Sequence, residues 1–147
     1  MKKRRRWWIC FLVGIGVLWA AAAFMLDHES RIPAFVIRHR EDLEEIAVSC
    51  LQGDGAVEKY RGVKVEGVYS GEHEIVQFLY FAFGLVPSTR YYGFYYSQDD
   101  VPVPFQNAGA VLSQVSEEEW NWYDAGTDNG GRTKRITDHW FYYEAWF

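Results

Sequence analysis

The longest hydrophobic run in the chain covers residues 7–26, where twenty consecutive residues carry no charge. At a rise of about 1.5 Å per residue, a helix of this length spans the roughly 30 Å hydrocarbon core of a bilayer. The basic residues Lys2 to Arg6 precede the run, and Asp27 follows it. Because Lys and Arg are retained on the cytoplasmic side, the pattern predicts a single-pass membrane protein with Met1 in the cytoplasm and the rest of the chain outside.

The same segment has the features of a cleavable signal peptide, because Ala20 to Ala23 offer small-residue cleavage sites. The apolar run continues to Leu26, which is longer than the hydrophobic region of a typical signal peptide and favours retention. Both alternatives export the domain, and cleavage would make it a secreted protein. The expected organisation is a basic cytoplasmic tail (residues 1–6), a transmembrane helix or signal anchor (residues 7–26) and an extracytoplasmic domain (residues 27–147).

Apolar residues recur at steps of three and four along the first part of this domain, which predicts one amphipathic helix. The helix is expected to begin between Ser30 and Ala34, because Pro33 suits a first helical turn, and to run to Leu51. Gly53 and Gly55 then end it. The apolar positions on its face are Leu43, Ile46, Ala47, Cys50 and Leu51.

The spacing changes to two after Gly55, which is typical of strands. Residues 63–69 alternate as a half-buried strand, and residues 75–85 form an apolar run in which only Gln77 is polar before Gly84. This second run predicts a central strand covered on both faces. Residues 91–97 predict a third strand, whereas Pro102 and Pro104 place residues 98–114 mostly in a loop.

The pair Asn129-Gly130 favours a two-residue hairpin turn joining residues 118–128 with residues 131–146. A turn there would set Asp124 opposite Arg135 and Trp120 opposite His139. With this hairpin the domain has one helix and about five strands. The predicted fold class is α+β, with the amphipathic helix packed on a curved antiparallel sheet.

Composition and charge exclude several classes of protein. Apolar residues make up 49% of the chain and aromatic residues 18%, which is far from the signature of disorder. From Asp27 onward ten basic side chains face twenty acidic ones, so the domain would repel a phosphate backbone, and nucleic acid is excluded as a partner. Cys10 lies in the apolar run and Cys50 in the domain, which precludes a disulfide within the domain.

Aromatic residues alternate on both faces of the predicted strands, although a single helix covers only one face. The second face is covered either by the loop of residues 98–114, by curling of the sheet, or by a partner. An exposed aromatic face would bind an envelope protein, a peptide or a glycan, because Tyr and Trp provide flat apolar area with a polar group. The candidate binding residues are Tyr91, Tyr95, Trp140, Tyr142 and Trp146. The alternative is the set that alternates with them, Tyr92, Phe94, Tyr96, Phe141, Tyr143 and Phe147.

Catalytic signatures are weak in comparison. Asp99 and Asp100 with a histidine are the residues that an alternative function, a cell-envelope hydrolase, would use. Residues 72–74 (Glu-His-Glu) lack a second histidine at helical spacing. The sequence therefore predicts no catalytic residues, no metal site and no cofactor, and favours a non-enzymatic binding domain. A structural domain that caps a larger membrane assembly is a third alternative.

Two stretches, Gly93–Gln106 (GFYYSQDDVPVPFQ) and Thr127–Phe147 (TDNGGRTKRITDHWFYYEAWF), carry a family resemblance. They resemble uncharacterised small exported or membrane-anchored proteins of Gram-positive anaerobic bacteria, over about a quarter of the chain. The resemblance implies a bacterial cell-envelope protein and brings no activity, cofactor or functional residue with it.

Overall fold

The computed structural model describes residues 27–54, 57–85 and 88–147, and the predicted anchor of residues 7–26 lies outside them. Among the described residues no helix is long and apolar enough to cross a bilayer. The chain divides into two units, Met1–Arg31 and Ile32–Phe147. The sheet and its cores belong entirely to the second unit.

Two helices, rather than the single one predicted, precede the sheet: α2 (His28–Arg38) and α3 (Arg40–Gln52). His39 separates them with a non-helical φ of −117° and ψ of 22°. The break lets each helix turn its own apolar residues toward a twisted sheet, which a straight helix of this length cannot follow. Gly53 ends α3 in the left-handed conformation, as predicted, with φ 77°.

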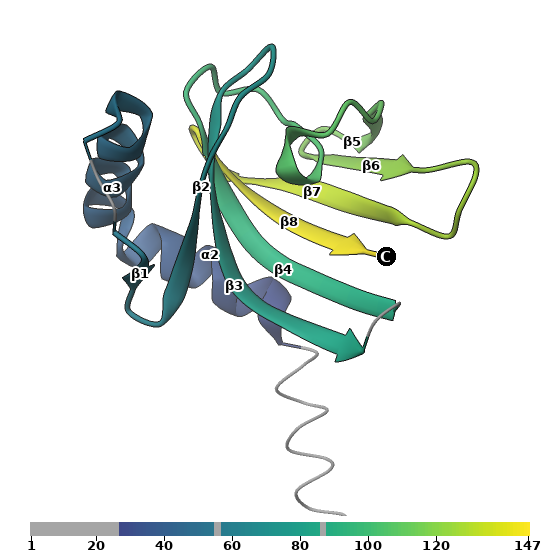
Figure 1. Cartoon of the computed structure of the whole chain (residues 1–147), viewed down its shortest axis with the longest axis horizontal. Coiled ribbons are helices and arrows are strands. Elements are labelled where there is room, and N and C mark those ends of the chain that lie inside the picture. Colours follow the sequence, from purple (N-terminus) through teal and green to yellow (C-terminus); the bar gives the residue numbers. More distant parts are fainter. Residues whose placement is uncertain (1–26, 55–56, 86–87) are drawn as a thin grey trace, which may run out of the picture. The chain divides into compact units, whose positions relative to one another are not determined.

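Eight antiparallel strands form one sheet in the order β1-β2-β3-β4-β8-β7-β6-β5, so the prediction of about five strands was too low. Two four-strand meanders meet where β4 pairs with β8 (Figure 1). The α+β class is confirmed. The strands are β1 (Lys59–Tyr60), β2 (Val63–Tyr69), β3 (Ile75–Leu85), β4 (Ser88–Ser97), β5 (Ser113–Ser116), β6 (Glu119–Tyr123), β7 (Gly130–Thr137) and β8 (Trp140–Trp146).

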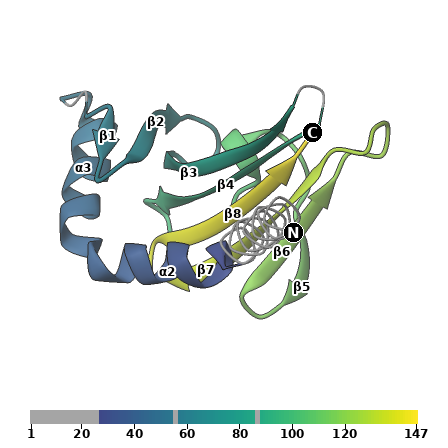
Figure 2. The same ribbon diagram turned by 90° about the horizontal axis from the view of Figure 1, so that it is seen from below.

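Each face of the sheet carries its own core. On the helix face, α2 and α3 pack on β2, β3, β4 and β8 through residues such as Val36, Leu43 and Phe78, and Figure 2 shows the two helices in succession along this side. On the opposite face, the segment of residues 98–112, called the lid below, covers Tyr95, Phe141 and others. The lid includes a short 3-10 turn, η1 (Phe105–Asn107).

The C-terminal hairpin differs from its prediction. Residues 124–129 form a six-residue loop between β6 and β7, and Trp120 lies opposite Thr133 rather than His139. A carboxylate sets this loop length, because Asp124 Oδ1 accepts the Gly126 N–H at 3.0 Å and Oδ2 accepts the Thr127 hydroxyl at 3.0 Å. A second turn at residues 138–139 separates β7 from β8, where one long strand was predicted.

Strand β3 has the predicted limits, but only its first half is covered on both faces. Residues 75–78 are buried, whereas residues 82–85 are exposed. The apolar run therefore extends beyond the core as one arm of the β3–β4 hairpin.

Candidate functional site: an aromatic groove beside the lid

The five predicted binding residues do not form one surface. The register pairs Tyr95 with Phe141 and Tyr96 with Trp140, so Tyr91 and Tyr95 lie on the lid face while Trp140, Tyr142 and Trp146 lie on the helix face. Three of them are core residues: Tyr95, Trp140 and Tyr142 are at most 1% exposed. Only Tyr91 and Trp146 are partly exposed.

A groove of about 410 Å³ lies instead between the lid and the β6–β7 hairpin. Its volume falls within the range of about 300–1,000 Å³ that is usual for small-molecule sites. Its walls combine aromatic rings with polar side chains. The lining residues are Phe105, Gln106, Ala108, Ala110, Trp122, Tyr123, Asp124, Ala125, Asn129 and Phe147.

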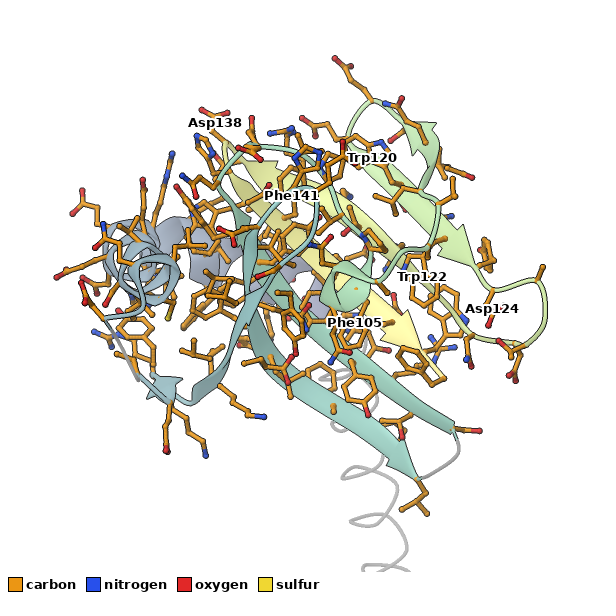
Figure 3. The ribbon with its side chains drawn as sticks, turned by 45° about the horizontal axis from the view of Figure 1, so that its top comes forward. Phe105, Trp120, Trp122, Asp124, Asp138 and Phe141 are labelled. Atoms are coloured by element: carbon orange, nitrogen blue, oxygen red, sulfur yellow. The ribbon has the colours of Figure 1, made fainter. Side chains whose placement is uncertain are left out.

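Three rings from separate elements form the apolar part of the groove. Phe105 comes from η1, Trp122 from β6 and Phe147 from the residue after β8. Ring centroids lie 5.6 Å apart for Phe105 and Phe147, and 6.2 Å apart for Trp122 and Phe147. Figure 3 shows Phe105 and Trp122 on neighbouring elements, with Asp124 just beyond Trp122 at the end of β6.

The polar part of the groove comes from the lid and the hairpin loop. Gln106 and Asn129 contribute amides, which can both donate and accept hydrogen bonds, and Asp124 contributes a carboxylate. Among the residues that the structure describes, no lysine or arginine lines the groove. This arrangement suits a neutral ligand that offers hydroxyl groups and an apolar face, and it disfavours an anion.

The buried phenol of Tyr95 fixes the middle of the lid. Its oxygen accepts the Val103 N–H at 2.9 Å, and the hydroxyl lies 3.2 Å from both the Val103 carbonyl and Thr133 Oγ1. Burial raises the pKa of Tyr95, so the phenol keeps its proton at neutral pH. Tyr95 is therefore an anchor of the lid and not a surface contact.

The polar residue noted in the apolar run, Gln77, fixes the lid at a second point. It is completely buried, accepts the Gln106 N–H at 3.0 Å and donates to Glu66 Oε2 at 2.7 Å. The next residue of the lid, Asn107, donates to the His73 carbonyl at 2.8 Å. These bonds hold η1, and with it Phe105, against the sheet.

A carboxylate fixes the start of the lid. Asp100 Oδ1 accepts hydrogen bonds from Arg135 Nη1 at 2.6 Å and from the His139 backbone N–H at 2.7 Å. Burial alone would raise the pKa of Asp100, but the bonds from His139 and Arg135 outweigh it and lower this pKa below its ordinary value of 3.8. Asp100 and His139 both have positive φ, of 56° and 66°, and the shared bond holds this pair of strained turns together.

We expect Asp100→Asn to destabilise the chain by about 1 kcal/mol at pH 7, because the charge-assisted bonds to Arg135 and His139 are weakened. Asparagine tolerates the same left-handed backbone, so the variant isolates the charge. A group with a lowered pKa stabilises the fold above its unfolded-state pKa. The stabilisation is therefore present above about pH 4 and is lost as the pH falls through the folded-state pKa.

Urea unfolding of both proteins at pH 7 and near pH 2.5 measures this effect. The difference between them should be smaller at the lower pH, because wild-type Asp100 loses its charge as the pH falls through its lowered folded-state pKa. Asp99→Asn is the matched control, because Asp99 is an exposed neighbour bonded to His73 at 3.0 Å. An equal penalty at both pH values would show that charge is not what Asp100 contributes.

Asp99 and Asp100, the carboxylates of the alternative hydrolase, contact different partners and do not converge on one histidine side chain. Asp99 bonds to His73, whereas Asp100 bonds to Arg135 and the backbone of His139, whose Nδ1 lies 3.0 Å from the Ser97 carbonyl. In the described part of the chain, no group of three or more His, Cys, Asp or Glu side chains is arranged to hold a metal ion. The geometry gives both carboxylates a structural use.

Sequence reasoning missed the groove residues Phe105, Trp122 and Asp124, and included Phe147 only in the alternative aromatic set. One signal was available for Phe105, an aromatic side chain directly after Pro104 in a connection that also contains the apolar residues Val101 and Val103. Its burial shows that the lid is a packed element.

No protein-family model matches the chain, and no curated protein or solved structure matches it.

Proposed function

We propose that this chain is a membrane-anchored, extracytoplasmic binding protein of the cell envelope, and that its groove binds a glycan. The observation that carries the proposal is the composition of the groove, in which Phe105, Trp122 and Phe147 adjoin Gln106, Asp124 and Asn129. Sugar rings have an apolar C–H face that packs on aromatic rings, and hydroxyl groups that bond to amides and carboxylates.

Backbone pairing favours a glycan over an extended peptide. A peptide that adds to a sheet needs a strand edge with free N–H and C=O groups. The strand residues that line the groove are already paired, since Trp122 lies opposite Gly131 and Tyr123 opposite Gly130 in the β6–β7 ladder. Side chains are therefore the means of recognition that the groove offers.

The fixed lid supports a preformed site. Phe105 and Gln106 sit on η1, which Gln77 and the residues around it hold in place. Groups that are already ordered lose little conformational entropy on binding. The groove is thus suited to rigid recognition rather than to closure around a ligand.

Phe147→Ala tests the proposal, because the ring lines the groove while the backbone of Phe147 keeps its hydrogen bonds to Thr89. The full chain in lipid nanodiscs is titrated by calorimetry with chitotetraose, cellotetraose and maltotetraose. For the tetrasaccharide that binds, we expect an affinity about tenfold weaker in the variant, or about 1.4 kcal/mol.

Val115→Ala is the matched control, since Val115 is 60% exposed on β5 and does not line the groove. Unchanged affinity in Phe147→Ala would place the ligand elsewhere. If extended peptides bind and none of the oligosaccharides does, the ligand of the groove is a peptide and the glycan proposal is wrong.

A further inference from the structure

One end of the sheet carries a row of apolar and aromatic side chains on the helix face. In the register, Phe83 lies opposite Arg90, Arg90 opposite Trp146, Trp146 opposite Gly130, and Gly130 opposite Tyr123. Directly paired residues project from the same face. Leu85 extends the row toward the tip of the β3–β4 hairpin. We call Phe83, Leu85, Arg90, Trp146 and Tyr123 the end row.

Three side chains of the end row are largely exposed to solvent. Leu85 is 86% exposed, Tyr123 67% and Phe83 55%. Throughout the described residues, the large aromatic side chains that are exposed are Phe83, Tyr123 and Phe147, and all three lie at this end of the sheet. The clustering indicates a surface with a partner, because single exposed apolar residues are normally scattered.

Close packing makes the row continuous. Gly130 has no side chain, and a Cβ there would lie 2.7 Å from the Trp146 ring. The indole therefore crosses this position, and its centroid lies 6.0 Å from that of Tyr123. On its other side Arg90 stacks on the same ring, with Cζ 5.7 Å from the centroid.

The opposite end of the sheet is rich in acidic side chains. Its turns and the start of the lid carry carboxylates, and Figure 3 shows Asp138 there, far along the sheet from Asp124. The end that carries the end row has fewer carboxylates, Asp124 and Asp128 in the β6–β7 loop, so an anionic bilayer repels the opposite end more strongly. The acidic residues at this end are Glu72, Glu74, Asp99, Asp100, Glu117, Glu118 and Asp138.

We infer that the end row docks on the outer surface of the bilayer, with Phe83 and Leu85 entering the region of the lipid headgroups. This inference rests on the anchored state in the proposed function. Trp and Tyr are enriched at membrane interfaces, where their rings lie at the level of the lipid headgroups. Arg90 supports the row from within the protein, because its guanidinium stacks on Trp146 and is paired with Glu144 at 2.9 Å.

Chain length supports the bilayer as the occupant. Ile32 is completely buried in the core of the sheet unit, and only residues 27–31 separate it from the predicted anchor. Five residues span at most about 18 Å even when fully extended. An anchored chain therefore holds this domain at the membrane surface, where an exposed aromatic end has lipid within reach.

Depth-dependent fluorescence quenching tests the inference on the full chain, in vesicles of phosphatidylcholine and phosphatidylglycerol. Leu85→Cys, in a background of Cys10→Ala and Cys50→Ala, carries an environment-sensitive NBD label. We expect blue-shifted emission and loss of fluorescence when the vesicles contain lipids with a nitroxide near the headgroup. The matched control is Val115→Cys in the same background, which is exposed on β5 and should show neither change.

Flotation of the same vesicles separates the two proposals. A chain that fails to float overturns the anchor and, with it, docking of the end row. A chain that floats while its labels at positions 85 and 115 remain equally unquenched overturns docking alone. Blue-shifted emission at position 85 without quenching by lipid nitroxides also overturns it, because protein, such as a second copy of the chain, would then cover the end row.

Discussion

Gly93→Ala is expected to destabilise the domain by about 3–5 kcal/mol, near the upper limit for single substitutions. Gly93 lies in the middle of β4, and a Cβ there would overlap the Phe78 carbonyl of β3 and lie 2.7 Å from the Tyr143 ring of β8. The Tyr143 ring can shift only at the expense of other packing, and the backbone carbonyl can move only by breaking the ladder. Most of the stability of a domain this size would be lost.

The matched control for Gly93→Ala is Gly109→Ala in the lid. A Cβ at Gly109 meets no atom within 4 Å, and its φ is not in the left-handed region. The change should be neutral or stabilising by up to about 1 kcal/mol, because alanine restricts the unfolded chain. Urea unfolding of the full chain, followed by tryptophan fluorescence, compares the two. Similar midpoints for both variants would contradict the close packing of β4 between β3 and β8.

Tyr95→Phe is expected to cost about 2 kcal/mol of stability and to loosen the lid. The change removes one buried oxygen and leaves the Val103 N–H without its acceptor and Thr133 without one of its partners. A buried group left unsatisfied costs about 1–3 kcal/mol, which is more than the net contribution of an ordinary hydrogen bond. Hydrogen exchange at the Val103 amide should become faster than in the wild type.

Tyr123→Phe provides the comparison for Tyr95→Phe, because Tyr123 is an exposed tyrosine on the neighbouring hairpin. Its stability should change by less than about 0.5 kcal/mol. An unchanged exchange rate at Val103 in Tyr95→Phe would mean that the lid does not depend on this phenol, and would reopen a binding role for Tyr95.

Local sequence patterns correctly predicted two strands and the end of a helix. The alternation of residues 63–69 and the apolar run of residues 75–85 match β2 and β3, and Gly53 ends its helix as expected. The break at His39 was not predictable, because the apolar spacing continues across it. It depends on the twist of a sheet that forms from residues much later in the chain.

The register of the C-terminal strands was mispredicted for a different reason. Asn129-Gly130 resembles a tight turn, but Asp124 organises a longer loop, and Gly130 lies in β7 beneath the Trp146 ring. The local residue types are consistent with both the two-residue turn and the six-residue loop, and tertiary packing decides between them. The same reasoning explains the mixed set of aromatic candidates, since the pairing of β4 with β8 decides which residues share a face.

The candidate site was beyond local reasoning because its residues meet only after the lid crosses the sheet. Phe105, Trp122 and Phe147 are spread over more than forty positions of the chain. The sequence did allow for a lid, because covering of the second face by the loop of residues 98–114 was one of the predicted alternatives. Gln77 supported it as a polar residue in an apolar strand, a position that requires a hydrogen-bond partner.

The last two residues of the chain connect the groove with the end row. Trp146 belongs to the end row, and Phe147 continues the ladder through its bonds to Thr89 while its ring lines the groove. If the end row docks as inferred, the groove opens at the level of the lipid headgroups. Protein and ligand would then meet by diffusion in two dimensions, and a glycan carried on a lipid would reach an effective concentration far above that of the same sugar in free solution.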